Sequence, residues 1–220
     1  GFDESGKNVF ITGTGEDARE SHTFKVNIKT GKYSKLTTQN GTHATKLSSN
    51  GDYLIDNYSN LTTPNAIEIV DVKKAKSTSI HIAKNPLTAY NIGKTDLITL
   101  KGANGTDLYA RVIKPANFDE TKKYPVLIYV YGGPHAQMVT NSWLGGANLW
   151  MDAFASNENY IVFTIDNRGS ANRGFAFESA IHRNLGDVEI EDQLTGINYL
   201  KSLNYVDSDR IAVNGWSYGG

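Results

Sequence analysis

Hydrophobic and polar residues alternate with a period of two along residues 1 to about 90, which predicts short strands with one buried face. Thr30-Gly31 and Asn50-Gly51 lie between such segments and supply residues that accept a positive φ in tight turns. Roughly four to six antiparallel strands would match one or two blades of a β-propeller, although a piece of a β-sandwich has the same periodicity. The alternating segments read NVFITGTG, SHTFKVNIKTGKYSKLT, THATKLSSNGDYLIDNYS, NAIEIVDV and STSIHIA.

The pattern changes near Thr95, where continuous apolar runs replace the alternation. Such runs are typical of strands buried on both faces of a mostly parallel sheet. They read YPVLIYVYGG, YIVFTIDNRG and RIAVNGWS, and they follow a predicted hairpin that turns at Asn104-Gly105. The segments between the runs, LGGANLWMDAFASNEN and GDVEIEDQLTGINYLKSLNYV, are predicted helices. The order strand, helix, strand, helix, strand predicts a doubly wound α/β sheet.

The second predicted helix is amphipathic. Asp187 is expected to cap its start, where acidic residues also favour the positive end of the helix dipole. The apolar residues recur at three- and four-residue spacing, which predicts that they form the buried face. That face would consist of Ile190, Leu194, Ile197 and Leu200.

Composition excludes several classes of protein. The 220 residues carry a formal net charge of −1 with scattered basic residues, which argues against a nucleic-acid partner. The chain has no cysteine, so disulfides and thiolate chemistry are excluded. No apolar run reaches about 18 residues, so we expect no membrane span in this chain.

The last apolar run leads into Gly215-Trp216-Ser217-Tyr218-Gly219, which fits the pattern G-x-S-x-G. In an α/β sheet this pattern places a nucleophilic serine on a sharp turn between a strand and a helix, where the small residues allow close backbone approach. The helix that follows directs its positive end toward a developing oxyanion. A glycine-rich turn without catalytic function is the alternative, but the preceding strand favours Ser217 as a nucleophile.

Tyr131-Gly132-Gly133-Pro134 follows the first apolar run. In α/β-hydrolases the loop after this early strand contributes to oxyanion stabilisation, and a tyrosine at the strand end could direct its O–H there. Tyr131 could equally be an ordinary aromatic residue of the strand. His135 lies nearby, but we do not expect it to be the general base, because in this fold the base follows the nucleophile in sequence.

The chain resembles the prolyl oligopeptidase family of serine peptidases, in particular its dipeptidyl peptidase IV branch and the bacterial prolyl dipeptidyl and tripeptidyl aminopeptidases. The resemblance covers essentially all 220 residues. It implies an α/β-hydrolase domain in residues 93–220, comprising the N-terminal part of a doubly wound sheet. It also implies that residues 1–92 are the last part of a β-propeller. The motifs that carry it are GTHATKLSSNGDYLIDNYSNLTTP, VYGGPHAQ, DNRGSANRGFAFESAIHRNLGDVEIEDQ and YVDSDRIAVNGWSYGG.

The resemblance also assigns roles to single residues. Ser217 matches the nucleophile, and the backbone N–H of Tyr218 and the hydroxyl of Tyr131 match the two oxyanion donors. Trp216 is expected to pack beside the site rather than react. For the DNRGS and LGDVEIEDQ motifs we expect a structural role, in which Arg168, Glu189 and Asp192 form charge pairs that brace sheet and helix.

By resemblance, the triad aspartate and histidine would follow residue 220, and the residues that bind the substrate N-terminus would precede residue 1. We therefore expect the chain to be a segment of a longer enzyme and to be inactive alone, because a serine without a base is a poor nucleophile.

The function implied is that of an exopeptidase that removes dipeptides or tripeptides after proline from peptide N-termini. Acylaminoacyl peptidase or oligopeptidase activity on the same scaffold, or a catalytically inactive homologue that binds a partner, are the alternatives. The expected partners are peptides with proline near the N-terminus, and a homodimer would fit the family. No metal or organic cofactor is implied. Bacterial relatives suggest a periplasmic, secreted or cell-surface location.

Overall fold

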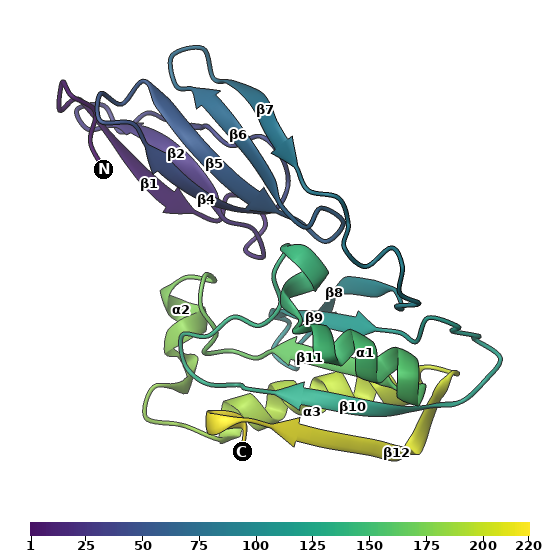
Figure 1. Ribbon diagram of the computed structural model, residues 1–220. Helices are drawn as coiled ribbons and strands as arrows, with labels where there is room; N and C mark the ends of the chain where they lie inside the picture. The colour runs from purple at the N-terminus through teal and green to yellow at the C-terminus, as the bar shows by residue number, and fades with distance from the viewer. The chain divides into compact units, whose positions relative to one another are not determined.

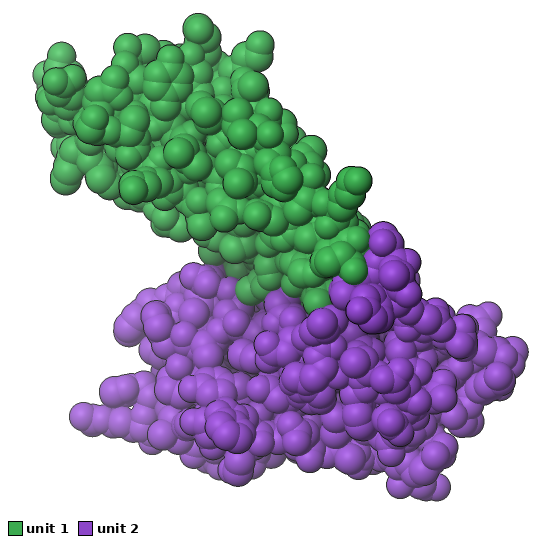
Figure 2. All heavy atoms as spheres, viewed as in Figure 1, with its two compact units in different colours: residues 1–86, 140–144 green, residues 87–139, 145–220 purple.

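The structure is a computed structural model that describes residues 1–220 (Figure 1). The chain forms two compact units, coloured separately in Figure 2. Unit 1 comprises residues 1–86 and 140–144, and unit 2 comprises residues 87–139 and 145–220. The predicted domain boundary, between residues 92 and 93, remains a prediction.

Unit 1 consists of two antiparallel sheets in which consecutive strands pair with each other. The turns between strands behave as the sequence predicted, since Gly31 and Gly51 both have positive φ. The first sheet contains β1 (Asn8–Gly13), β2 (His22–Asn27) and β3 (Tyr33–Lys35). The second contains β4 (Thr42–Leu47), β5 (Tyr53–Ser59), β6 (Ala66–Asp71) and β7 (Lys76–Ile82).

The core of unit 1 lies between these two sheets. Phe10 of β1 packs with Leu54 of β5 and Val70 of β6, and all three side chains are buried. β5 and β6 show the predicted alternation of buried and exposed residues, whereas β3 and β7 contain no buried residue.

Unit 2 contains a five-stranded mixed sheet of order β12-β10-β11-β9-β8. The three apolar runs form the parallel strands: β10 pairs in parallel with both β11 and β12. The predicted hairpin adds the antiparallel pair on the other side of β11. The strands are β8 (Thr95–Lys101), β9 (Asp107–Ile113), β10 (Tyr124–Val130), β11 (Ile161–Asp166) and β12 (Val206–Gly215).

Helices cover both faces of this sheet. Neighbouring residues of β11 point to opposite faces, so Val162 packs with Ala155 of α1 (Leu149–Glu158), whereas Phe163 packs with Leu200 of α3 (Asp187–Ser202). Figure 1 shows α1 and α3 on opposite sides of the strands. The prediction of a doubly wound α/β sheet is confirmed. The remaining elements are short helices: η1 (Trp143–Gly146), α2 (Phe175–Glu178), η2 (Ser179–Ile181) and η3 (Ser217–Gly219).

The predicted buried face of α3 is partly wrong. Leu200 is buried and Ile197 packs against the core, but Ile190 is 60% exposed and Leu194 is 49% exposed. The buried positions of the helix also follow helical spacing, and they are Glu189, Asp192, Gly196 and Leu200.

Two features explain this rotation of α3. Gly196 lets the helix approach β11 closely, since a Cβ atom there would lie 2.8 Å from Cε1 of Phe163. The two buried carboxylates have hydrogen-bond partners near the sheet edge, which offsets the cost of removing them from water. The helix also begins differently from the prediction: Gly186, with φ of +99°, precedes it in the cap position and Asp187 is its first residue.

Candidate active site

The candidate site lies at the carboxyl ends of β10 and β12. The two strands are parallel neighbours in which Val130 pairs with Gly215. Because parallel strands end at the same edge of a sheet, Tyr131 and Ser217 leave the sheet side by side. This edge is where α/β sheets bind ligands.

Ser217 occupies a strained turn. Its φ is +55°, a left-handed conformation that L-residues other than glycine adopt at a cost of about 1–2 kcal/mol. It begins η3, which only Trp216 separates from the end of β12, and the N–H of Gly219 donates to the carbonyl of Trp216 at 3.0 Å. The side chain is exposed at the sheet edge. This geometry is that of a nucleophile elbow.

The two flanking glycines of the motif are required by close backbone contacts. A Cβ atom at Gly215 would overlap the carbonyl oxygen of Gly219, and one at Gly219 would overlap the carbonyl oxygen of Val130. These neighbours are main-chain atoms, which cannot rotate away as a flexible side chain can. The G-x-S-x-G spacing therefore follows from how tightly the turn folds back onto β10 and β12.

Gly219→Ala is expected to destabilise the elbow by about 1–3 kcal/mol, the usual cost of forcing an extra methyl group into a filled site. The overlap with Val130 can be relieved only by moving η3, so labelling of Ser217 by a fluorophosphonate should slow as well. Thermal unfolding and labelling rate test this together. Gly220→Ala is the matched control, because a Cβ atom there meets its nearest neighbour at 3.2 Å. An unchanged labelling rate in Gly219→Ala would contradict the prediction.

Tyr131 and Tyr218 converge on Gly133. A Cβ atom at Gly133 would lie 2.7 Å from Cε1 of Tyr131 and 3.1 Å from Cβ and Cγ of Tyr218. Gly133 itself is buried, whereas Tyr131 is partly exposed and Tyr218 is 39% exposed. The structure thus brings together the three residues predicted for the site, Ser217, Tyr131 and Tyr218, although their catalytic roles remain predictions.

Glu189 joins the elbow to α3. The Tyr218 hydroxyl donates to Glu189 Oε1 at 2.7 Å, and the N–H of Gly186 donates to Glu189 Oε2 at 3.0 Å. The hydrogen bond to the carboxylate is the main cause that raises the pKa of Tyr218, so the phenol stays protonated at neutral pH. Sequence reasoning assigned Glu189 to a charge pair with Arg168, and this part of the prediction is wrong.

The other predicted charge pair is confirmed. Arg168 donates from its backbone N–H to Asp192 Oδ2 at 2.7 Å and from Nη2 to Oδ1 at 2.8 Å. Asp192 is fully buried, and its hydrogen bonds raise the pKa of Arg168 further above its ordinary value. Glu191 forms a second, more exposed salt bridge with the same guanidinium. The pair fixes the loop after β11 to α3.

Asn167 is a site-supporting residue that sequence reasoning missed. It is fully buried, and its amide donates to the carbonyl oxygens of Gly132 at 3.0 Å and Arg168 at 2.7 Å. Its Oδ1 accepts a hydrogen bond from Gln193 at 3.1 Å. Asn167 therefore ties the loop after β10 to the loop after β11. Its position in the DNRGS motif, at the end of an apolar run, was the available signal.

Asp166 holds the far end of the loop after β10. Its two carboxylate oxygens accept hydrogen bonds from the N–H groups of Met138 and Val139, both at 2.9 Å. Burial raises the pKa of Asp166 to about 6, although these bonds and the Arg111 guanidinium lower it. The fully buried Arg111 donates to the carbonyl of Met138 at 2.7 Å, so the same loop is held from both sides.

Protonation of Asp166 should make the free energy of unfolding higher at low pH than at neutral pH. Its pKa is about 6 in the folded chain and near 3.8 when unfolded, so the folded state binds this proton more tightly. The free energy of unfolding should fall as pH rises from about 4 to 6, by about 3 kcal/mol for this group. Denaturant titrations of wild type and Asp166→Asn across pH 4–7 test this, because the variant lacks this component. Parallel curves would contradict the prediction.

The side chains of His135 and Trp216 are both largely exposed. His135 Nδ1 lies 2.9 Å from Glu178 Oε2, and its side chain is 82% exposed. Trp216, which was expected to pack, is instead 74% exposed.

The structure contains no group of three or more histidine, aspartate or glutamate side chains that could hold a metal ion. No helix is long and apolar enough to cross a membrane.

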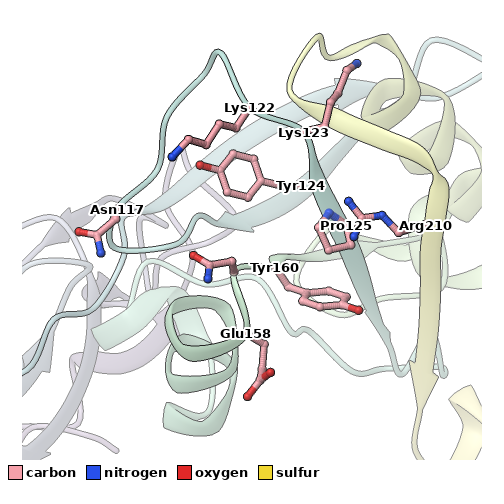
Figure 3. A pocket seen from close by; sticks show the side chains of 9 residues that line it. Asn117, Lys122, Lys123, Tyr124, Pro125, Glu158, Tyr160 and Arg210 are labelled. Atoms are coloured by element: carbon pink, nitrogen blue, oxygen red, sulfur yellow. The ribbon is translucent and has the colours of Figure 1, made fainter.

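A pocket of about 420 Å³ lies at the opposite edge of the sheet (Figure 3). Tyr124 begins β10 and Tyr160 directly precedes β11, so the pocket lies at the amino ends of the strands. Its basic residues have partners of their own: Lys122 pairs with Asp119, Lys123 donates to the carbonyl of Val206, and Arg210 pairs with Asp207. This pocket is therefore separate from the elbow.

Comparisons with known proteins match both halves of the chain. The model of the prolyl oligopeptidase family matches residues 147–220, and that of the dipeptidyl peptidase IV N-terminal region matches residues 1–65. Mouse dipeptidyl peptidase 8 is 33% identical over 99% of this chain and 25% of its own length. Mouse prolyl endopeptidase FAP is 39% identical over 62% of this chain and 18% of its own length.

Solved structures give the same result. A Bacteroides ovatus protein described as a dipeptidyl aminopeptidase IV superposes with a TM-score of 0.92 at 47% identity. Porphyromonas gingivalis dipeptidyl peptidase 4 superposes with a TM-score of 0.87 at 30% identity. Each match covers 100% of this chain and 31% of the solved chain. The chain thus spans about a quarter to a third of the length of the proteins that match it from end to end.

Fold and site together define the first part of an α/β-hydrolase domain with a nucleophile elbow, preceded by blades of a β-propeller. The chain belongs to the prolyl oligopeptidase family of serine peptidases, in its dipeptidyl peptidase IV branch. The resemblance inferred from the motifs is confirmed, and of the two interpretations of residues 1 to about 90 the propeller is correct.

Proposed function

We propose that this chain supplies the nucleophile and oxyanion donors of a serine exopeptidase that removes dipeptides or tripeptides after proline. One observation carries the proposal: Ser217 has a φ of +55° in an elbow at the end of β12, next to Tyr131 at the end of β10. The nucleophile must reach the carbon of a reacting carbonyl group while the oxyanion donor reaches its oxygen, so the two residues must lie close together. Two adjacent parallel strand ends supply that arrangement.

In the proposed reaction, Ser217 Oγ attacks the carbonyl carbon of the scissile bond. The negative charge that develops on the carbonyl oxygen is stabilised by the N–H of Tyr218 and the O–H of Tyr131. Collapse of the tetrahedral species expels the amine of the leaving peptide and forms an acyl-enzyme, which water then hydrolyses. The proton transfers need a histidine–aspartate pair, which the family resemblance assigns to positions after residue 220.

The names of the relatives indicate two types of peptidase, and that of FAP indicates cleavage at proline. Dipeptidyl peptidases 8 and 4 release dipeptides, whereas the relative FAP is named a prolyl endopeptidase. Exopeptidase activity is favoured because mouse dipeptidyl peptidase 8 and Porphyromonas gingivalis dipeptidyl peptidase 4 match this chain from end to end, whereas FAP matches 62% of it. Endopeptidase activity is the second candidate. From the family resemblance, we also propose an exported location and a homodimer.

The test uses the product of the complete open reading frame. Hydrolysis of X-Pro and X-Y-Pro chromogenic amides with a free N-terminus is compared with that of the same amides carrying a blocked N-terminus. Turnover only of the free-amine substrates is expected, and turnover of blocked substrates would favour the endopeptidase. The 220-residue chain alone is expected to show no turnover. Absence of turnover and of fluorophosphonate labelling in the complete, folded protein would exclude the proposed function.

A further inference from the structure

We infer that Glu189 is a positioning residue for catalysis, which acts through the Tyr218 hydroxyl to fix the oxyanion donors. The inference rests on the proposed function of Ser217, Tyr131 and Tyr218. It adds a residue on another element, α3, whose role is to orient the peptide group that follows the nucleophile.

Both oxygens of the Glu189 carboxylate accept hydrogen bonds. It is 6% exposed, with Oε1 accepting from the Tyr218 hydroxyl at 2.7 Å and Oε2 accepting from the N–H of Gly186 at 3.0 Å. Glu189 lies in the first turn of α3, and that helix is itself fixed to the sheet through Gly196 and Leu200. Tyr218 is therefore attached to a helix that packs closely on the sheet of unit 2.

Tyr218 is held at its other side by the loop after β10. Its Cβ and Cγ lie 3.1 Å from the position of a Cβ atom at Gly133, and the Tyr131 ring touches the same position. The Tyr218 side chain thus spans from Glu189 to the loop that carries Tyr131. With both ends held, the peptide group between Ser217 and Tyr218 has little freedom to rotate, and the N–H of this group is the proposed oxyanion donor.

The chemistry of the contact favours positioning over simple filling of space. A buried carboxylate costs free energy that an apolar side chain of similar volume would not. Both of its donors are neutral, so the carboxylate fixes directions through hydrogen bonds and not through an ion pair. A bond between a phenol and a carboxylate is short and strong, which suits a contact that must hold a strained elbow.

Loss of this contact should weaken transition-state binding more than substrate binding. The N–H of Tyr218 and the O–H of Tyr131 must point at one oxygen atom, so a small rotation of the elbow misaligns one donor. The oxyanion exists only along the reaction, so kcat should fall while KM stays nearly unchanged.

The test uses the complete protein with Tyr218→Phe, Glu189→Ala and Glu189→Gln. The first two should lower kcat by roughly 10-fold or more, the worth of one hydrogen bond to a charged group, with KM within about twofold. Glu189→Gln should largely restore activity, because its amide can accept from Gly186 and donate to the Tyr218 oxygen. The double variant Tyr218→Phe/Glu189→Ala should be no slower than the slower single variant, since both remove one contact.

Two further readouts separate positioning from stability. Affinity for a peptide boronic acid, which forms a tetrahedral adduct on the serine, should fall in parallel with kcat/KM, while affinity for the product peptide should not. Glu191→Ala is the matched control on the same helix turn, because its carboxylate is half-exposed and binds Arg168 instead. It should leave kcat unchanged.

The inference is overturned if Tyr218→Phe and Glu189→Ala lower the melting temperature but leave kcat and boronate affinity within about twofold. The fluorophosphonate labelling rate gives the same comparison without any peptide substrate. If the unmutated protein labels but cleaves no prolyl substrate, the proposed specificity fails while the labelling rates of the variants still test Glu189.

Discussion

Ser217→Ala is expected to lower kcat/KM for a prolyl substrate by roughly 10⁵- to 10⁶-fold and to abolish fluorophosphonate labelling. The hydroxyl is the atom that forms the acyl-enzyme, so no neighbouring group can replace it. Residual hydrolysis would come only from the oxyanion donors and substrate binding, as in other serine hydrolases without their nucleophile. Steady-state kinetics of the complete protein, with mass spectrometry of the labelled peptide, measure both effects.

The structure supplies a control for folding. Alanine and serine meet the same strain at a φ of +55°, so Ser217→Ala should unfold at nearly the wild-type temperature. Ser217→Gly should be equally inactive but more stable than Ser217→Ala, by about 1 kcal/mol, because glycine adopts this conformation without strain. Turnover or labelling near the wild-type level in both variants would show that another residue is the nucleophile.

The features that depend on local periodicity could be predicted from the sequence. The apolar runs 124–133 and 160–169 became the largely buried parallel strands β10 and β11, as runs without polar alternation predict. The run 210–217 also became a parallel strand, but β12 lies at the edge of the sheet in this chain and Val213 is 63% exposed. The elbow was predictable for a related reason. Its glycines are required by contacts within one short turn and with the adjacent strand, so their spacing in the sequence reports the geometry directly.

The features that depend on partners distant in sequence could not be predicted in the same way. The buried face of α3 carries Glu189 and Asp192, which an amphipathic pattern assigns to solvent. Their burial becomes favourable only once Tyr218 and Arg168 provide hydrogen bonds, and no helix periodicity contains that information. Asn167 was missed for the same reason, since its partners lie on other elements.

The periodicity of the sequence alone could not distinguish a propeller blade from a β-sandwich. Antiparallel strands with one buried face look alike in a blade and in a sandwich, because both bury alternate residues between sheets. The two sheets of unit 1, with Phe10 and Val70 between them, fit either description when taken alone. The match of residues 1–65 to the dipeptidyl peptidase IV N-terminal region decides between them.

Tyr131→Phe is expected to lower kcat by roughly 10²- to 10³-fold with little change in KM, the effect of removing one oxyanion donor. The substitution deletes only the phenolic O–H. The ring, whose Cε1 lies against Gly133, stays in place, so the melting temperature should change little. Pre-steady-state acylation rates and thermal unfolding of the complete protein measure the two quantities.

Tyr131→Phe also distinguishes a catalytic phenol from one that only binds substrate. Peptide boronic acids should bind the variant more weakly by about the factor lost in kcat/KM, because their adduct carries the charge that Tyr131 is proposed to stabilise. Tyr129→Phe, on the same strand two residues earlier, is the matched control and should leave kcat unchanged. A rise in KM with unchanged kcat would instead assign Tyr131 to ground-state binding, and the N–H of Tyr218 would then be the sole oxyanion donor within this chain.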